Sequence, residues 1–494
     1  MTAYQQLESH FKRLNSLRGA AGILHWDHAV MMPPGAASAR GEQLATLDLL
    51  AHQMASDPHV GDLLDRAERD TSSLDEWERA NLYHMRRLYK EANAIPEELV
   101  EVKARAAVAS EVCWRVARET SDFASWAPHL EEIVKIVREI AAAKGEALAL
   151  SPYDALLEAF DPGMRVSTID RIFGELSGVL PGLIQAAIDK QGSRKLLPLE
   201  GPFPIDKQRS LALALMKQIG FDFNRGRLDV SAHPFCGGGL DDIRITTKYT
   251  ESDFASALMG VLHETGHAMY EFGLPEEWAW QPVGDALGMT LHESQSLLFE
   301  MQVCRSPEFL GYVAPLIQSA FNGKGPAWEG DNLYHHYTRV ERGFIRIDAD
   351  EVTYPAHVIL RYRLERRLID GTLSVRELPE AWSDELESLL GIRPPDHKRG
   401  CMQDIHWSDG SFGYFPVYTL GALLAAQLFE AAKATVPHLL EEVQRGNFVP
   451  LFTWLRDQVH GHGSRLSSEE LTKRATGRPL GIGSWTAHIK KRYL

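Results

Sequence analysis

The sequence predicts a mainly α-helical protein with a small β-sheet beside one central helix. Apolar residues recur at three- and four-residue spacing through much of residues 4–190, which is the period of amphipathic helices. Between residues 227 and 249 apolar and polar residues instead alternate at period two, which predicts short strands. Helical spacing returns after residue 293, so helices precede and follow the strands along the chain.

The composition is that of an ordinary globular protein. We expect no nucleic-acid or membrane partner. The 494 residues are 44% hydrophobic and 24% charged. A chain of this length can form about two to four domains. A net charge of −15 argues against nucleic acid or an anionic membrane as a partner. No apolar run reaches the length of a membrane-spanning helix.

The cysteines and the N-terminal residues favour a cytoplasmic location. The cysteines lie far apart and form no C-x-x-C pair, so disulfides and thiolate zinc sites are not expected. Residues 1–6 lack the basic and apolar segments of a signal peptide. The four cysteines are Cys113, Cys236, Cys304 and Cys401.

The helical pattern predicts a boundary near residue 190. Residues 1–190 are expected to form an N-terminal helical lobe, in which Ser167 and Asp170 would form a capping box at a helix start. Residues 191–206 hold two glycines and three prolines and are the best candidate linker. Residues 207–494 would then form one continuous catalytic region.

Two short strands are predicted directly before the central helix. Leu228 and Val230 alternate with polar residues on one side of the glycine-rich residues 236–239, and Ile243 and Ile245 do so on the other. We expect a β-hairpin whose edge could hold an extended peptide through main-chain hydrogen bonds. The alternative is a hairpin that only covers the core.

The central helix is predicted over residues 250–273, with Thr250 and Asp253 as its capping box. It contains the sequence His-Glu-Thr-Gly-His. His263 and His267 are four positions apart and therefore lie on the same side of the helix.

These histidines have the geometry required of two ligands of one Zn²⁺ ion, and Glu264 could take a proton from a metal-bound water. The alternative is a surface helix with two solvated histidines. The apolar neighbours Val261, Leu262 and Met269 argue against it, because they make the helix apolar on most sides and therefore buried.

A catalytic zinc site needs a third protein ligand and one open position. Glu293 is the next acidic residue in a strongly helical, apolar context, 26 residues after His267. That interval fits a turn and a second helix that runs antiparallel to the first and directs Glu293 at the two histidines. Glu271 and Glu300 remain competing candidates for the third ligand.

Taken together, several motifs resemble those of the thermostable metallocarboxypeptidases of the carboxypeptidase Taq family. The resemblance covers nearly the whole chain. It implies a mostly helical, two-lobed protein around a deep channel, a homodimer, and removal of single residues from peptide C-termini. The motifs are His25-Trp26-Asp27 with Met32-Pro33, His233-Pro234-Phe235, Asp242–Thr246, His263–His267, His292–Gln295, Ile345–Asp350 and Gly400–Trp407.

The expected cofactor is Zn²⁺, with Co²⁺ or Mn²⁺ as possible substitutes in a site of two histidines and one glutamate. The metal would lower the pKa of a bound water, and Glu264 would act as the general base. A second donor would help to hold the developing oxyanion. The resemblance makes His406 the first choice for this donor and Tyr418 the second.

A carboxypeptidase must also recognise the free carboxylate of its peptide partner. Arg346 is the candidate, because a guanidinium matches the two oxygens of a carboxylate. The alternative is a structural ion pair between Arg346 and Asp348 or Asp350. By the resemblance, the segment from His233 to Phe235, together with Arg244, would line the far end of the channel and limit substrate length.

Two other functions compete with this one. Helical oligoendopeptidases also carry the sequence His-Glu-Thr-Gly-His-Ala, and only a carboxylate anchor separates them from a carboxypeptidase. A non-catalytic helical scaffold could keep the metal helix. Glu264 counts against the scaffold, because no structural zinc site requires it.

Overall fold

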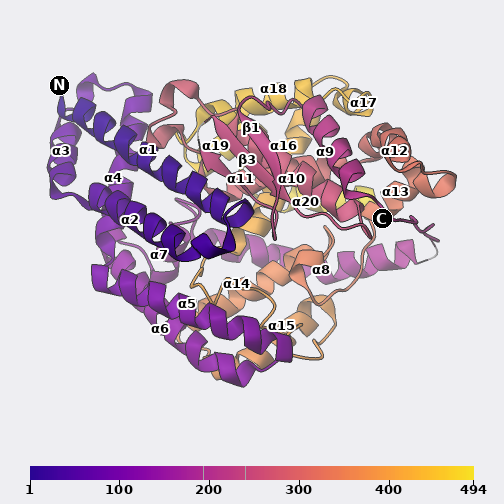
Figure 1. The fold of residues 1–494 in the computed structure, drawn as a ribbon, viewed down its shortest axis with the longest axis horizontal. Helices are drawn as coiled ribbons and strands as arrows, with labels where there is room; N and C mark the ends of the chain where they lie inside the picture. Colours follow the sequence, from indigo (N-terminus) through magenta and orange to yellow (C-terminus); the bar gives the residue numbers. More distant parts are fainter. Residues whose placement is uncertain (193, 240) are drawn as a thin grey trace.

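The computed structural model describes residues 1–192, 194–239 and 241–494. Its first part consists of helices, and Figure 1 shows α1–α4 gathered at one end of the molecule with α5 and α6 beside them. Buried residues of α1, α3 and α4, among them Leu7, Phe11, Leu64 and Met85, form a hydrophobic cluster of their own. The bounds are α1 (Ala3–Val30), α2 (Ala37–Ser56), α3 (Pro58–Arg69), α4 (Glu76–Ala94), α5 (Glu97–Thr120), α6 (Phe123–Leu148), α7 (Pro152–Leu157) and α8 (Val166–Gln191).

The predicted capping box at the start of α8 is not formed. The helix begins at Val166, and neither Ser167 nor Arg165 caps it through a side chain. Instead the Val166 N–H donates to Oδ1 of Asp154 on α7, at 2.7 Å. A carboxylate at a helix N-terminus satisfies a free N–H group and stabilises the helix dipole. The prediction was wrong because the capping group comes from another element.

The second part of the chain surrounds the predicted metal helix. Figure 1 shows α10, α11 and α16 in the middle of the molecule, beside the strands. The bounds are α9 (Ile205–Ile219), β1 (Gly226–Val230), β2 (Cys236–Gly239), β3 (Asp242–Thr247), α10 (Ala255–Glu271), α11 (Gly288–Leu297), α12 (Pro307–Phe321), α13 (Gly330–Tyr337), α14 (Tyr354–Asp370), α15 (Leu378–Leu390), α16 (Pro416–Thr435), α17 (Leu439–Gln444), α18 (Val449–Gln458), α19 (Ser468–Thr476) and α20 (Gly483–Tyr493).

The strands form a three-stranded sheet in the order β1-β3-β2. β1 and β3 pair in parallel, with Arg227 opposite Arg244, and β2 pairs antiparallel with β3. The prediction of a hairpin with a glycine-rich turn was therefore wrong in topology, because the glycine-rich segment is itself the edge strand β2. Only glycine fits at position 238, where φ is +107° and a Cβ would lie 2.0 Å from the Asp242 carbonyl oxygen.

The metal helix α10 begins at Ala255, and its cap differs from the predicted one. Oδ1 of Asp253 accepts hydrogen bonds from the N–H groups of Ala255 and Ser256, at 2.8 and 3.2 Å. Thr250 instead forms a single β-bridge with Asp253. Asp253 is thus the capping residue, one turn later than the sequence pattern indicated.

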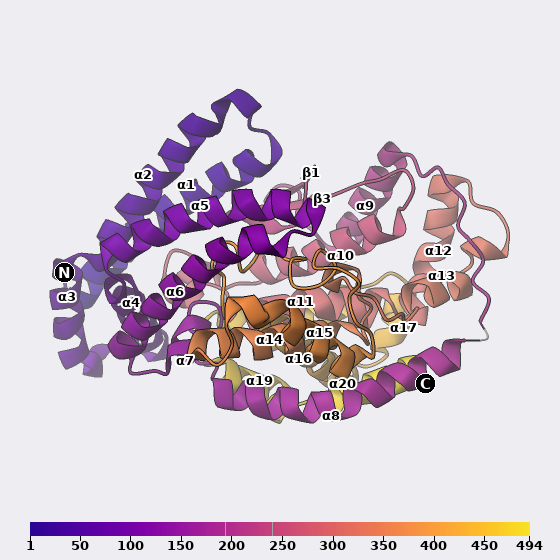
Figure 2. The same cartoon turned by 90° about the horizontal axis from the view of Figure 1, so that it is seen from below.

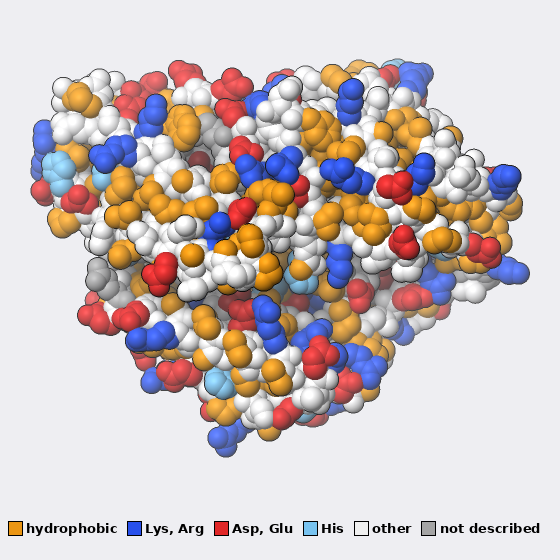
Figure 3. All heavy atoms as spheres, in the orientation of Figure 1, with side chains coloured by type: hydrophobic (Ala, Val, Ile, Leu, Met, Phe, Trp, Pro, Cys, Tyr) orange, Lys and Arg blue, Asp and Glu red, His pale blue; other side chains and the backbone are white. Residues whose placement is uncertain are grey.

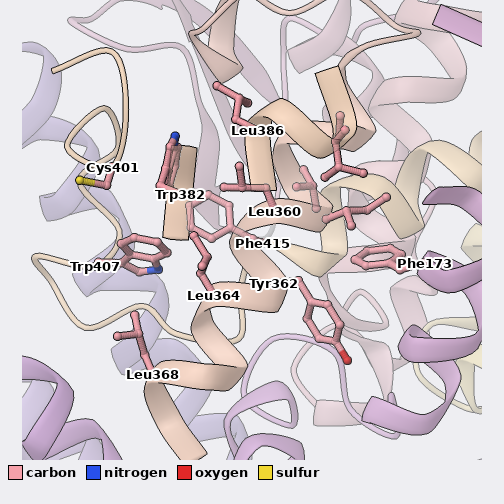
Figure 4. Packing of buried hydrophobic residues seen from close by; sticks show 14 of the residues in the cluster. Phe173, Leu360, Tyr362, Leu364, Leu368, Trp382, Leu386, Cys401, Trp407 and Phe415 are labelled. Carbon is pink, nitrogen blue, oxygen red and sulfur yellow. The ribbon is translucent and has the colours of Figure 1, made fainter. Parts of the chain in front are cut away.

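The largest hydrophobic cluster joins the two parts of the chain. It contains residues of α6 and α8 together with residues of α14, α15, α16 and α20. Figure 4 shows Phe173 of α8 near Tyr362 of α14, and Leu360 of α14 near Trp382 of α15. Residue 193 of the predicted linker at 191–206 lies outside the described residues. α8 ends at Gln191 and α9 begins at Ile205, and the core contains residues from both sides of this linker. The boundary between two separate lobes therefore stays a prediction.

The surface carries charges of both signs, interspersed with apolar groups on the face shown in Figure 3. Figure 2 shows α8 along the outside of the molecule next to α20. Within the described residues, none of the helices combines the length and the hydrophobicity needed to cross a bilayer.

Asp161 is a buried carboxyl group where the N-terminal helices meet α11. It is 1% exposed. A Cβ on Gly288, the first residue of α11, would lie 2.8 Å from its Oδ1. Burial raises the pKa of Asp161 to about 7, and the nearby Glu158 adds to this effect. Asp161 is therefore mostly protonated in the folded protein at mildly acidic pH.

We expect the Asp161→Asn variant to change how stability depends on pH. The pKa of Asp161 is raised by folding, so its contribution to stability is full below about pH 4 and is lost as pH rises through about 7. The difference in thermal-unfolding midpoint, parent minus variant, should therefore fall between pH 5 and pH 8. Two midpoint curves that run parallel over this range would contradict the assignment.

Candidate metal centre and active site

Helices α10 and α11 bring His263, His267 and Glu293 together. One ligand atom from each of the three residues lies within 4.8 Å of the others. Nε2 of His267 is 3.6 Å from Oε2 of Glu293, and Nε2 of His263 is 4.0 Å from Oε1. A tetrahedral zinc site with bonds near 2.0–2.1 Å has neighbouring ligand atoms roughly 3.3–3.4 Å apart. The donor set and its spacing therefore fit a Zn²⁺ ion.

Two glycines allow α10 and α16 to approach α11 closely. A Cβ on Gly266 of α10 would lie 2.7 Å from the Ser296 Cα and 2.9 Å from the Gln295 carbonyl oxygen, both backbone atoms of α11. A Cβ on Gly421 of α16 would lie 2.9 Å from Cβ and Cγ of Glu293. The absence of side chains at these two positions therefore determines where Glu293 lies.

The outer nitrogen of His263 contacts a buried carboxylate. Its Nδ1 lies 2.9 Å from Oε2 of Glu300, and Arg305 donates to Oε1 of Glu300 at 2.6 Å. Glu300 lies in the π-helical segment η5 (Leu298–Cys304), which continues α11. Segments of this kind often occur at functional sites. A carboxylate on the outer nitrogen of a ligand histidine fixes the orientation of its ring.

The outer nitrogen of His267 contacts a second imidazole. Nδ1 of His267 lies 2.7 Å from Nδ1 of His292, and Nε2 of His292 lies 2.7 Å from Oε1 of Glu271. Glu271 and Glu300 thus lie on the side of the histidines that faces away from Glu293. This arrangement favours Glu293 over its two competitors as the third ligand, as the sequence predicts.

Acidic side chains shape the electrostatics of the centre. Burial alone would lower the pKa of His263, but the hydrogen bond to Glu300 and the nearby carboxylates outweigh burial and raise this pKa to about 10. Burial raises the pKa of Glu264 to about 7 and also raises that of Glu293. A concentration of negative charge of this kind attracts a divalent cation, and Glu264 has a proton affinity suited to a base near neutral pH.

Arg346 lies in a buried cluster close to this centre. Its Nε and Nη2 donate to Oδ1 of Asp404 at 3.1 and 2.9 Å, and its Nη1 donates to the Tyr354 hydroxyl at 2.8 Å. The alternative ion pair with Asp348 or Asp350 is not formed among the described residues. Asp350 instead accepts from the backbone N–H groups of Val352 and Thr353.

The cluster contains more positive than negative charge. Arg361, which is fully buried, donates to Oδ2 of Asp404 through Nε at 2.7 Å. Burial would raise the pKa of Asp404, but the guanidiniums of Arg361 and Arg346 outweigh it and hold the pKa well below its usual range. One carboxylate therefore faces two guanidiniums. Arg346 uses three of its roughly five donors in these bonds, which leaves donors for another anion.

His406 and Tyr418 lie beside the Arg346 cluster. The Arg346 guanidinium is 5.0 Å from the Tyr418 ring centroid, and Tyr418 contacts Tyr414 edge to face at 5.2 Å. The His406 ring lies 5.7 Å from that of Tyr414. Burial lowers the pKa of His406 to about 4, so its imidazole is neutral at pH 7. Their roles as oxyanion donors stay predictions.

The motifs around His233 and Arg244 contact each other rather than the metal ligands. Oγ1 of Thr246 accepts from the Phe235 N–H at 3.0 Å, and the Phe235 carbonyl accepts from the Thr246 N–H at 2.9 Å. Arg244 binds both carboxylate oxygens of Asp242, at 2.9 and 2.7 Å, and lies 4.2 Å from the Trp26 ring centroid. His233 is exposed. Their proposed effect on substrate length stays a prediction.

Two cavities border the metal ligands and their partners. One of about 190 Å³ is lined by His263, Glu293 and Tyr354, which connects the metal ligands to the partner of Arg346. The other, of about 690 Å³, is lined by Glu271 and His292 and by residues of α1 and β2. His263 thus lines one cavity, and His292, the partner of His267, lines the other.

Sequence reasoning missed the residues that support the site. Asp404 and Tyr354 hold Arg346, Arg361 holds Asp404, and Arg305 holds Glu300. Asp404 lies inside the Gly400–Trp407 motif, which was the available signal. Nothing in the local pattern indicates that Arg305, 42 residues after His263, belongs to the site.

The whole chain matches known proteins. Residues 6–493 match the family model described as Carboxypeptidase Taq (M32) metallopeptidase. The chain is 37% identical to "Thermostable carboxypeptidase 1" of Thermus thermophilus over 99% of this chain and 98% of that one. It is 32% identical to "Carboxypeptidase 1" of Bacillus subtilis over 98% of this chain and 96% of that one.

Solved structures agree with this match. The fold is similar to that of "Trypanosoma Cruzi Metallocarboxypeptidase 1", with a TM-score of 0.97 and 39% identity over 99% of both chains. It is also similar to the M32 carboxypeptidase from Deinococcus radiodurans R1, with a TM-score of 0.94 and 35% identity over 99% of this chain and 98% of that one. The chain therefore belongs to the carboxypeptidase Taq (M32) family of metallopeptidases.

Proposed function

We propose that this protein is a zinc carboxypeptidase that releases single amino acids from the free C-termini of peptides. The observation that supports the proposal is the link between Arg346 and the cavity of the metal ligands through Tyr354. Tyr354, which accepts from Arg346, lines the same cavity as His263 and Glu293. A peptide with its terminal carboxylate on Arg346 would have its last amide bond near the metal ligands.

His263, His267 and Glu293 would hold the metal. When bound, Zn²⁺, or Co²⁺ or Mn²⁺ in its place, supplies Lewis acidity and lowers the pKa of water. Glu264 would accept the proton of the attacking water and then deliver it to the leaving amine. Its burial beside the metal ligands places it where it can carry out both steps.

The Arg346 cluster would bind the terminal carboxylate. Arg346 and Arg361 share Asp404 as their ion-pair partner among the described residues, so a substrate carboxylate would balance the remaining positive charge. This binding would place the scissile carbonyl in one register and limit the release to one residue. Tyr418 or neutral His406 would donate a hydrogen bond to the developing oxyanion.

The experiment compares free-acid peptides with their C-terminal amides in Arg346→Lys and Arg346→Ala variants. We expect kcat/KM for free acids to fall by at least about tenfold even in the lysine variant, because lysine keeps the charge and loses the two-pronged geometry. Weak cleavage of the amides should hardly change. Metal content and circular dichroism should match those of the parent.

An equal loss on both kinds of peptide would indicate that Arg346 has a structural role. Arg244 would then be the next candidate for binding the terminal carboxylate. Efficient cleavage of amides and of internal bonds by the parent would instead favour an oligoendopeptidase. A protein that binds metal and cleaves no peptide would favour the scaffold. A homodimer and a cytoplasmic location remain predictions, and sedimentation of the purified protein would test the first.

A further inference from the structure

The contact between His267 and His292 joins two identical atoms. Both partners are Nδ1 nitrogens, and they lie 2.7 Å apart. A hydrogen bond at this distance needs one proton between the two nitrogens, so one ring must donate and the other must accept. The direction of this bond follows from the surroundings of the other nitrogen of each ring.

The role proposed for His267 as a metal ligand fixes the direction of this hydrogen bond. Nε2 of His267 faces Glu293 at 3.6 Å, and it must carry no proton in order to bind a metal. The proton of neutral His267 is then on Nδ1, which donates to His292. His292 must accept with its own Nδ1 and carry its proton on Nε2, where Oε1 of Glu271 accepts it at 2.7 Å. Both hydrogen bonds then point away from the metal.

The two ligand histidines are therefore held differently. His263 contacts the carboxylate of Glu300 directly, and Arg305 neutralises this carboxylate. On its Nδ1 side, His267 reaches the carboxylate of Glu271 through the second imidazole. The His267 and His292 rings are 4.5 Å apart between centroids, so His292 also restricts the rotation of its neighbour.

We propose that His292 is a positioning residue, which holds His267 in the tautomer that binds the metal through Nε2, with Glu271 holding His292 in turn. This proposal rests on the metal site of the proposed function and extends it. Partners of this kind fix the tautomer and raise the basicity of a metal ligand, and their loss typically weakens metal binding by about 10–100-fold.

The test compares His292→Leu with His292→Asn. Leucine removes the acceptor, whereas the Oδ1 of asparagine occupies nearly the position of Nδ1 and can accept from His267. The dissociation constant for Zn²⁺ is measured by chelator competition at one pH, together with the thermal-unfolding midpoint of the metal-free protein. We expect the leucine variant to bind Zn²⁺ about 10–100-fold more weakly and asparagine to restore most of the loss.

His460→Leu is the matched control. His460 is a buried imidazole whose Nε2 contacts Oε1 of Gln295 on α11 at 3.0 Å, and its ring contacts Tyr270 of α10. Its removal should lower the unfolding midpoint and leave the Zn²⁺ affinity unchanged. This control separates a loss of packing near the two helices from a loss of the acceptor.

The proposal is overturned if the leucine variant binds Zn²⁺ as tightly as the parent. It is also overturned if both His292 variants lose affinity equally, because the ring and not the acceptor would then matter. Chelator competition needs no peptide. A parent protein that binds Zn²⁺ and cleaves no free-acid peptide would therefore contradict the proposed function and leave this inference intact.

Discussion

Glu264→Gln is expected to keep the metal and to lose peptide hydrolysis by about a hundredfold or more. Both histidines and Glu293 remain in the variant, so metal content should stay near that of the parent. The amide is close in size to the carboxylate but cannot accept the proton of the attacking water. Burial and the neighbouring carboxylates disfavour the charged form of Glu264. Its replacement by a neutral amide should therefore not destabilise the fold.

The measurement is kcat/KM on a free-acid peptide, with metal analysis of the same sample. Glu277→Gln is the control, because Glu277 is exposed in the turn η3 (Glu276–Trp278) after α10 and should be neutral. Near-full activity of the Glu264 variant would remove this residue from the mechanism. Loss of metal together with activity would make it a structural part of the centre.

Gly266→Ala is expected to damage the metal centre although it adds only one methyl group. The new Cβ would meet the Ser296 Cα at 2.7 Å, a backbone atom that cannot rotate away. Helix α11 would have to move, and Glu293 would move with it. We expect Zn²⁺ binding to weaken by at least about tenfold, because a carboxylate displaced by an ångström no longer completes the ligand set.

Gly260→Ala is the matched control on the same helix. A Cβ there meets nothing within 4 Å. This variant should raise stability by up to about 1 kcal/mol through helix propensity and should not affect metal binding. If Gly266→Ala fails to fold, Gly421→Ala also tests whether displacing Glu293 weakens metal binding. Its Cβ first meets the side chain of Glu293 and not the backbone of α11, so the distortion should be smaller. Unchanged Zn²⁺ affinity in both variants would contradict this account.

The sequence predicted which three candidate ligands come together, but not the residues around them. His263 and His267 follow from helix geometry within four residues, and Glu293 from the next helix along the chain. The partners of Arg346 could not be predicted, because Asp404 is separated from it by 58 positions and their contact depends on tertiary packing. An arginine in a motif does not reveal which carboxylate it will bind.

The sheet shows a similar limit. Alternation located the strands at Leu228 and Ile245, since it reflects which side chains of one strand are buried. It does not specify the neighbour of a strand, so the parallel pairing of β1 with β3 was missed. Glycines carry little of this alternation signal, which is why residues 236–239 were predicted to form a turn although they form strand β2.

The shared core has a consequence for how the chain is made. The apolar sides of α6 and α8 pack against α14 and α20, and α20 ends at Tyr493. At a synthesis rate of about 5–20 residues per second, α20 leaves the ribosome roughly 15–60 s after α8. During this interval the nascent α8 lacks the part of its core that α20 supplies. We therefore expect the newborn chain to depend on chaperones, and a stop codon before α20 to release an aggregating product.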